Sequence, residues 1–208
     1  MRDQTRTTEG NVMKAVAFLV RLLAYVNERL LLVGRGVGIA AVAVMVIVTI
    51  LQVFCRYVLD NALAWPDEAA RFCMLWMAGL MAPTAYRRGG FVAIDTIPAL
   101  MPRRLAEVLS LALLTLSLVV LVYCVQIGWK ETTGLGGKFA LASINLPTSI
   151  TFDTWMRVPR SWMMASLSVG VTLLTLVNFE LILRAFLRIF DADRDLPLIA
   201  LAPNTGAE

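Results

Sequence analysis

The sequence contains no histidine and only three cysteines in 208 residues. Without histidine, bis-histidine haem sites, histidine-containing zinc sites and histidine-based acid–base catalysis are excluded. The cysteines, Cys55, Cys73 and Cys124, form no C-x-x-C pair, so nothing suggests a redox dithiol or a zinc knuckle. We expect them to be small side chains packed among apolar neighbours.

Charge is also scarce. Charged residues make up 16% of the chain and hydrophobic residues 59%, with a mean hydropathy of +0.73, whereas soluble domains carry roughly 25% charged residues. A soluble globule of this size could not bury so much apolar surface. The composition predicts an integral membrane protein and excludes intrinsic disorder, a DNA-binding domain and a secreted disulfide scaffold.

Four stretches are predicted to span the membrane as helices, for which roughly 20 apolar residues are needed. They are residues 36–57, 66–87, 105–129 and 162–184. The first has no charge between Val37 and Phe54, and the second reaches full length only if its helix begins near Pro66. We therefore expect an all-α integral membrane protein with a single membrane domain.

Residues 12–33 are apolar but patterned differently. Charges recur every seven positions at Lys14, Arg21, Glu28 and Arg35, with Asn27 beside them, whereas Phe18, Leu22, Val26 and Leu30 occupy another face. This pattern predicts an amphipathic arm helix that lies in the membrane interface. The glycines at 34, 36 and 38 predict a bend into the first span. A cleaved signal peptide is the alternative, but apolar sequence continues past its possible cleavage site.

Basic residues set the orientation. The arm, the loop between the second and third spans, and the C-terminal end with its tail at 191–208 hold most of the 19 lysines and arginines. Both termini are therefore expected in the cytoplasm, and the loop at 130–161 in the periplasm. Glycines and prolines divide that loop into apolar pieces, which we expect to form short helices on the membrane or on a partner.

The start of the second span carries the most informative polar residues. Asp67 and Glu68 follow Trp65 and Pro66 and suit the positive start of a helix. Arg71 lies one turn later and can pair with either carboxylate. Charges at membrane depth predict a functional cluster. The alternative is a helix cap whose ion pair only fixes the depth of the helix.

The same span contains Gly79 four residues before Pro83, which predicts a kink and room for a neighbouring helix. The kink could be a hinge or a static packing feature. Arg87 and Arg88 end the helix at the cytoplasmic face and are expected to meet anionic lipid head groups. In the fourth span, Glu180 and Arg184 are expected to form a local ion pair.

The second span and the loop after it resemble the small membrane subunit (Q-type, DctQ) of tripartite ATP-independent periplasmic (TRAP) transporters. The residues that carry the resemblance are Trp65, Asp67, Glu68, Arg71, Trp76, Arg87, Arg88, Gly89 and Asp95. The chain departs from the family at Phe91 and Ala93, where histidine and a basic residue are common, and at Pro83.

The resemblance implies a scaffold subunit in the bacterial inner membrane, without catalytic activity, cofactor or metal. Its implied partners are a large membrane subunit, which moves solute and sodium ions, and a periplasmic binding protein that delivers an organic acid or similar solute. No transport-site residue is implied. The expected subunit or lipid interface residues are Trp65, Asp67, Glu68, Arg71, Trp76, Gly79, Arg87 and Arg88.

Three other functions are considered. An autonomous small transporter needs a central charged residue, and none stands out in the sequence. A quinone-linked redox protein needs paired cysteines. A general assembly or lipid-organising protein without a transport role differs from the TRAP subunit in its partners.

Overall fold

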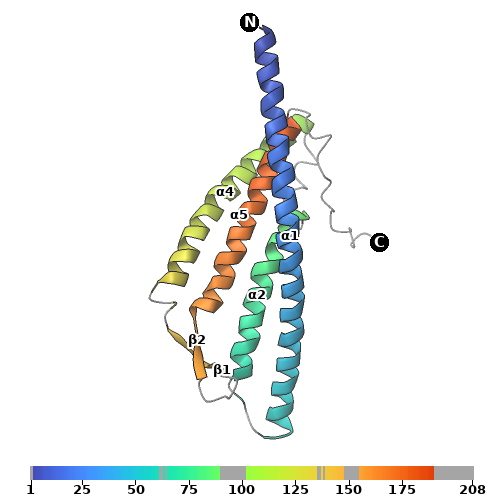
Figure 1. Ribbon diagram of the computed structural model, residues 1–208. Coiled ribbons are helices and arrows are strands. Elements are labelled where there is room, and N and C mark those ends of the chain that lie inside the picture. Colours follow the sequence, from blue (N-terminus) through green and yellow to red (C-terminus); the bar gives the residue numbers. More distant parts are fainter. Residues whose placement is uncertain are drawn as a thin grey trace, which may run out of the picture. The chain divides into compact units, whose positions relative to one another are not determined.

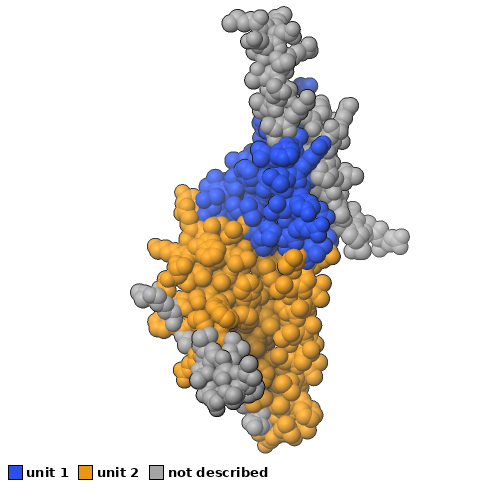
Figure 2. Space-filling model, in the orientation of Figure 1, with its two compact units in different colours: residues 1–32, 83–122, 173–208 blue, residues 33–82, 123–172 orange. Residues whose placement is uncertain are grey.

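The computed structural model describes residues 2–60, 63, 65–89, 102–134, 137, 139–147 and 155–189. Within them lie the helices α1 (Arg2–Tyr57), α2 (Trp65–Arg87), α4 (Arg103–Thr133) and α5 (Ser161–Ile189), and the strands β1 (Ala140–Pro147) and β2 (Trp155–Pro159), drawn in Figure 1. The chain divides into two compact units (Figure 2). Unit 1 comprises Met1–Leu32, Pro83–Val122 and Leu173–Glu208, and unit 2 comprises Val33–Ala82 and Tyr123–Thr172.

Three helical segments are long and apolar enough to cross a membrane, namely Val16–Tyr57, Arg104–Thr133 and Ser161–Arg188. The class of a helical membrane protein is thereby supported. The helix α2, 23 residues long, is not among the three, because Asp67, Glu68 and Arg71 fall in its first two turns and lower its hydropathy. The predicted second span is therefore an ordinary helix by length but the most polar of the four by composition.

The helix α1 runs unbroken from Arg2 to Tyr57, through the glycines at which a bend into the first span is predicted. Glycine weakens a helix by only about 1 kcal/mol per residue, and packing readily offsets this. In unit 2 the glycines serve that packing. A Cβ on Gly34 would lie 3.4 Å from the carbonyl oxygen of Leu80, and one on Gly38 would lie 3.0 Å from Cγ of Met81. The glycines thus let α2 approach α1.

Unit 2 also brings α2 and α5 into backbone contact. A Cβ on Gly79 would lie 2.5 Å from the carbonyl oxygen of Ser166, and one on Gly170 would lie 2.6 Å from that of Gly79. On the other side of α5, the hydroxyls of Thr132 and Ser168 are 2.8 Å apart. Small residues and hydroxyls therefore hold unit 2 together, as is typical of helix contacts in membranes.

The loop at 130–161 differs from the expectation of short helices. Its pieces β1 and β2 form a two-stranded antiparallel ribbon in unit 2, in which Asn145 is paired with Arg157 and Leu146 with Met156. Apolar and polar residues alternate at Ser143–Pro147, which favours a strand over a helix. The prolines Pro147 and Pro159 end the strands, where no ladder hydrogen bond is needed. Among the described residues, this ribbon is the departure from the all-α prediction.

Candidate functional site

A buried carboxylate on α5 is the most informative polar feature of unit 1. The side chain of Glu180 is fully buried, with 0% exposure, in a helix that is otherwise mostly apolar. Removing an ionised carboxylate from water is costly unless hydrogen-bond donors and opposite charge replace the water. The residues around Glu180 supply both.

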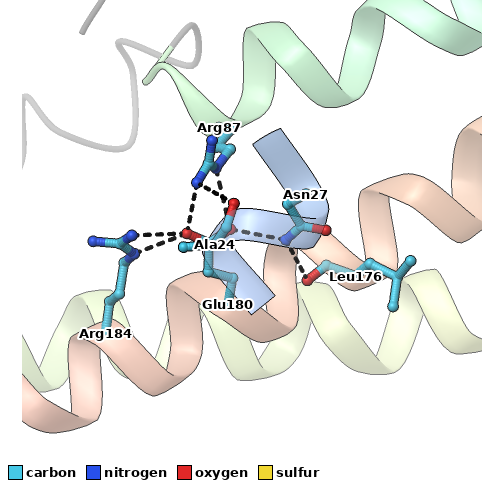
Figure 3. A network of polar contacts seen from close by, with 6 residues as sticks. All are labelled: Ala24, Asn27, Arg87, Leu176, Glu180 and Arg184. Atoms are coloured by element: carbon cyan, nitrogen blue, oxygen red, sulfur yellow. Dashed lines mark hydrogen bonds and ion pairs between the residues drawn. The ribbon is translucent and has the colours of Figure 1, made fainter. Parts of the chain in front are cut away.

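Two arginines hold this carboxylate. Arg87, in the last turn of α2, donates from Nε to Oε2 at 3.1 Å and from Nη2 to Oε1 at 3.0 Å, a two-point contact (Figure 3). Arg184, one turn along α5 from Glu180, donates from Nε to Oε1 at 3.0 Å, and its Nη2 lies 2.9 Å from the same oxygen. The side chains of Arg87 and Arg184 are only 14% and 7% exposed. The charges are thus largely shielded from solvent.

The helix α1 completes the contact through a neutral side chain. Asn27 donates from Nδ2 to Oε2 of Glu180 at 2.8 Å, and the same amide lies 3.4 Å from the carbonyl oxygen of Leu176. Arg87 also donates to the carbonyl oxygen of Ala24 at 3.3 Å. Figure 3 shows these donors converging on Glu180 from α1, α2 and α5. The three helices therefore share one carboxylate.

A second set of hydrogen bonds adds α4. The hydroxyl of Tyr86 donates to Oδ1 of Asn178 at 2.6 Å, and Nδ2 of Asn178 donates to the carbonyl oxygen of Leu114 at 3.1 Å. Asn178 is fully buried, with 0% exposure. We refer to the two sets together as the Glu180 cluster, formed by Asn27, Tyr86, Arg87, Asn178, Glu180 and Arg184. It joins four helices within unit 1.

The contact at Leu114 places the Glu180 cluster along α4. The contact at Leu114 lies two turns beyond Glu107, the last charged residue before an uncharged stretch that ends at Lys130. At a rise of 1.5 Å per residue, Leu114 lies about 10 Å inside that stretch. The cluster therefore lies level with apolar α4 sequence, and Arg87 is the last residue of α2, as the sequence predicts.

A known protein family matches the part of the chain that holds most of this cluster. The family model "Tripartite ATP-independent periplasmic transporters, DctQ component" matches residues 45–188. The chain belongs to the DctQ family. The matched region includes five of the six residues of the Glu180 cluster, and only Asn27 precedes it. A comparison with curated proteins finds no match.

Membership of the DctQ family confirms the resemblance inferred from the second span and supports the assignment to a TRAP transporter component. The family is one of transporter components and not of enzymes. Within the described parts of this DctQ chain, no group of three or more Cys, Asp or Glu side chains could hold a metal ion.

The structure separates the predicted interface residues of this DctQ chain. Arg87 turns into unit 1 and contacts Glu180. Gly79 packs against Ser166 of α5. Trp76 is partly buried, with its ring centroid 6.2 Å from that of Phe72.

The remaining predicted residues lie at the two ends of α2. Trp65, Asp67 and Arg71 are exposed, and Glu68 is half-buried. Arg88 is half-buried, and its backbone N–H donates to the carbonyl oxygen of Thr84 at 3.2 Å. Asp95 lies outside the described residues. The predicted residues therefore do not form one group.

Sequence reasoning found part of the Glu180 cluster. The ion pair between Glu180 and Arg184 is confirmed. The contact from Arg87 was missed, and Asn27 was placed beside the charged stripe, although it lies on the buried side of α1 with Val20, Ala24 and Leu31. The available signal was that polar residues are scarce in these helices. Asn27, Asn178 and Glu180 interrupt apolar sequence, and polar groups buried in a membrane pair with one another.

The contacts limit what the Glu180 cluster can do chemically. Oε1 of Glu180 accepts from Arg87 and Arg184, and Oε2 accepts from Asn27 and Arg87. A carboxylate has about four lone-pair sites, so these donors occupy it. Glu180 is suited to joining helices rather than to binding a mobile cation.

Proposed function

We propose that this DctQ chain is the small membrane subunit that braces the large, sodium-coupled membrane subunit of a TRAP transporter. That partner carries an organic acid or a similar solute, which a periplasmic binding protein delivers. The observation that carries the proposal is the family match over residues 45–188. The Glu180 cluster supports the bracing role, because its carboxylate is used to hold helices and is not left open to an ion.

We further propose the topology of this subunit: four spans at 36–57, 66–87, 105–129 and 162–184, an interfacial arm at 12–33, and both termini in the cytoplasm of a bacterium. The exposed residues of α1 support the arm. Phe18 and Leu22 are 67% and 52% exposed on one side, and Arg21 and Glu28 are exposed on another. A helix with such faces suits the boundary between lipid and water.

The continuity of α1 constrains this topology. Its apolar part, Val16–Tyr57, has 42 residues, which corresponds to about 63 Å of helix against roughly 30 Å of hydrocarbon. One half of α1 must therefore leave the hydrocarbon. The charges at Arg21, Glu28 and Arg35 assign that role to the N-terminal half.

The contact with the large subunit is proposed to include the outer end of α2, where Glu68 and Arg71 organise its edge, and membrane lipids are proposed to cover the remaining apolar surface. Replacing both Glu68 and Arg71 by alanine is expected to weaken co-purification with the large subunit. Replacing Glu28, on the arm, and Arg35, directly after it, is the matched control and is expected to leave co-purification unchanged.

Reconstitution tests the proposed function. The chain is co-expressed with the large subunit, purified in mild detergent, and placed in vesicles with the binding protein and a sodium gradient. We expect both subunits to co-purify, and solute uptake to require both. Uptake by this chain alone would assign transport to it. Complete uptake by the large subunit without this chain would refute the bracing role.

A further inference from the structure

In unit 2, two flanks of α2 are occupied by other helices of the same chain. Gly79 lies against the backbone of Ser166 in α5, and Leu80 lies at Gly34 in α1. Leu80 is correspondingly buried. A third side of α2 meets neither helix and combines charged side chains with alanines.

This third side carries five exposed residues at helical spacing. They are Asp67, Arg71, Met74, Ala78 and Ala82, and we refer to them as the α2 outer face. Steps of three or four residues place them in one row along the helix. Its C-terminal part consists of alanines, and its N-terminal part carries a carboxylate and a guanidinium one turn apart.

The outward side of α4 has a different composition, which suits contact with lipid. Leu116, Tyr123 and Ile127 are 62%, 63% and 61% exposed there, and the sequence is uncharged between Glu107 and Lys130. Large apolar side chains suit flexible acyl chains. Alanines offer acyl chains little surface, but they let another helix approach closely, as in membrane helix pairs.

The charges on the α2 outer face argue in the same direction. Asp67 and Arg71 are both exposed, and charges facing lipid near a membrane are costly unless a partner of opposite charge meets them. A helix that lies along this face would satisfy them with a basic side chain opposite Asp67 and an acidic side chain opposite Arg71. The low hydropathy of α2, which keeps it out of the set of apolar helices, fits a helix covered by protein.

We propose that the α2 outer face receives a transmembrane helix of the large subunit, which presents small residues to Ala78 and Ala82 and a complementary pair of charges to Asp67 and Arg71. This proposal rests on the proposed function, because it takes the large subunit as the partner. It adds the helix face at which the two subunits meet. Lipid and a second copy of this chain are the competing occupants.

Site-specific photocrosslinking tests the face. The photoreactive residue p-benzoylphenylalanine replaces Ala78 in the complete co-expressed complex and, as a matched control, replaces Ala112, an exposed alanine on the outward side of α4. After irradiation, we expect a covalent adduct with the large subunit from position 78 and none from position 112. An adduct between two copies of this chain, adducts with lipid alone, or equal adducts from both positions would overturn the proposal.

Charge reversal tests the polar end of the same face. Asp67→Lys with Arg71→Glu reverses both charges and keeps the net charge, and we expect at least a tenfold loss of co-purified large subunit. The same exchange on the arm and directly after it, Glu28→Lys with Arg35→Glu, is expected to leave the yield unchanged. Normal yield from the α2 variant would refute the charge pairing. If the unaltered chain captured no large subunit at all, the proposed function itself would fail.

Discussion

At the scale of single residues, Glu180 is the side chain on which donors from three helices meet. An acidic residue one turn before an arginine predicts a pair within one helix, and that pair is present. The sequence could not indicate that Arg87, 93 positions away, would join it, because the contact depends on how α2 meets α5. Local spacing therefore revealed one donor, and the tertiary fold supplied the others.

Removing the charge of Glu180 tests the cluster directly. Glu180→Gln keeps the size of the side chain but leaves Arg87 and Arg184 without their shared carboxylate. Loss of one partner from a buried ion pair costs about 3–5 kcal/mol, so we expect a clear fall in the thermal midpoint of the detergent-purified protein. Glu28→Gln is the control, since Glu28 is exposed, and its midpoint should stay the same. Equal midpoints for the two variants would show that the cluster does not stabilise the fold.

The geometry of Arg87 gives a second residue-scale prediction. Its guanidinium makes two bonds to Glu180 and one to Ala24, whereas a lysine has a single ammonium and cannot reproduce the two-point contact. We expect Arg87→Lys to lower the free energy of unfolding by about 1–3 kcal/mol, measured in a denaturant titration. The neighbouring Arg88→Lys, outside the Glu180 cluster, should change it by less than about 0.5 kcal/mol. Larger loss from Arg88→Lys would contradict this assignment.

At the scale of elements, the glycines show that a helix can use glycine for packing as well as for flexibility. A bend is predicted at Gly34, Gly36 and Gly38, and the chain stays helical through all three. Glycine permits a bend without requiring one, so the path of the helix depends on how the neighbouring helix packs against it. Gly34 and Gly38 lie against α2, whereas Gly36 has open space beside it. The prediction that Gly79 admits a neighbouring helix is confirmed, because α5 meets Gly79 at Gly170, which has no side chain.

Alanine substitutions at two glycines test this distinction. A Cβ on Gly79 would lie 2.5 Å from a backbone oxygen of α5. The backbone of α5 would have to move to relieve this clash, which costs stability. We expect Gly79→Ala to lower stability by about 1–3 kcal/mol. Gly36→Ala meets nothing within 4 Å and should raise stability by up to about 1 kcal/mol through its helix propensity. Thermal unfolding of the two variants in the same detergent measures the difference. A loss of similar size in both would indicate a general intolerance of α1 and α2 to side chains.

The loop at 130–161 shows a different limit of sequence reasoning. Its apolar pieces were long enough for short helices, but β1 and β2 pair with each other. Strand pairing depends on a partner segment, here about ten positions further along the chain, so neither piece reveals the ribbon by itself. The membrane helices were easier to predict, because each satisfies its own backbone hydrogen bonds.

At the scale of the whole molecule, the described residues combine one closed polar site with two kinds of outward surface. The donors of the Glu180 cluster are turned inward and fill the acceptor sites of its carboxylate. Outward, α4 shows bulky apolar side chains, and α2 shows alanines and two charges beside the exposed Met74 and Leu75. A subunit that moved solute would need polar groups open to that solute. A subunit that braces a partner needs contacts that hold its own helices together and a surface for the partner, and the proposed function assigns both to this DctQ chain.

Transport kinetics distinguish these two roles. If the Glu180 cluster only holds the helices of the brace, Arg87→Lys should reduce the number of working complexes and leave each remaining complex unchanged. We expect the maximal rate of solute uptake in reconstituted vesicles to fall in proportion to the complex recovered, while the KM for solute and the dependence on sodium concentration stay the same. Arg88→Lys provides the matched control and should change neither quantity. A shifted KM or a changed sodium dependence at full complex yield would show that the cluster takes part in the transport cycle and does more than hold helices together, because loss of complexes alone changes neither parameter.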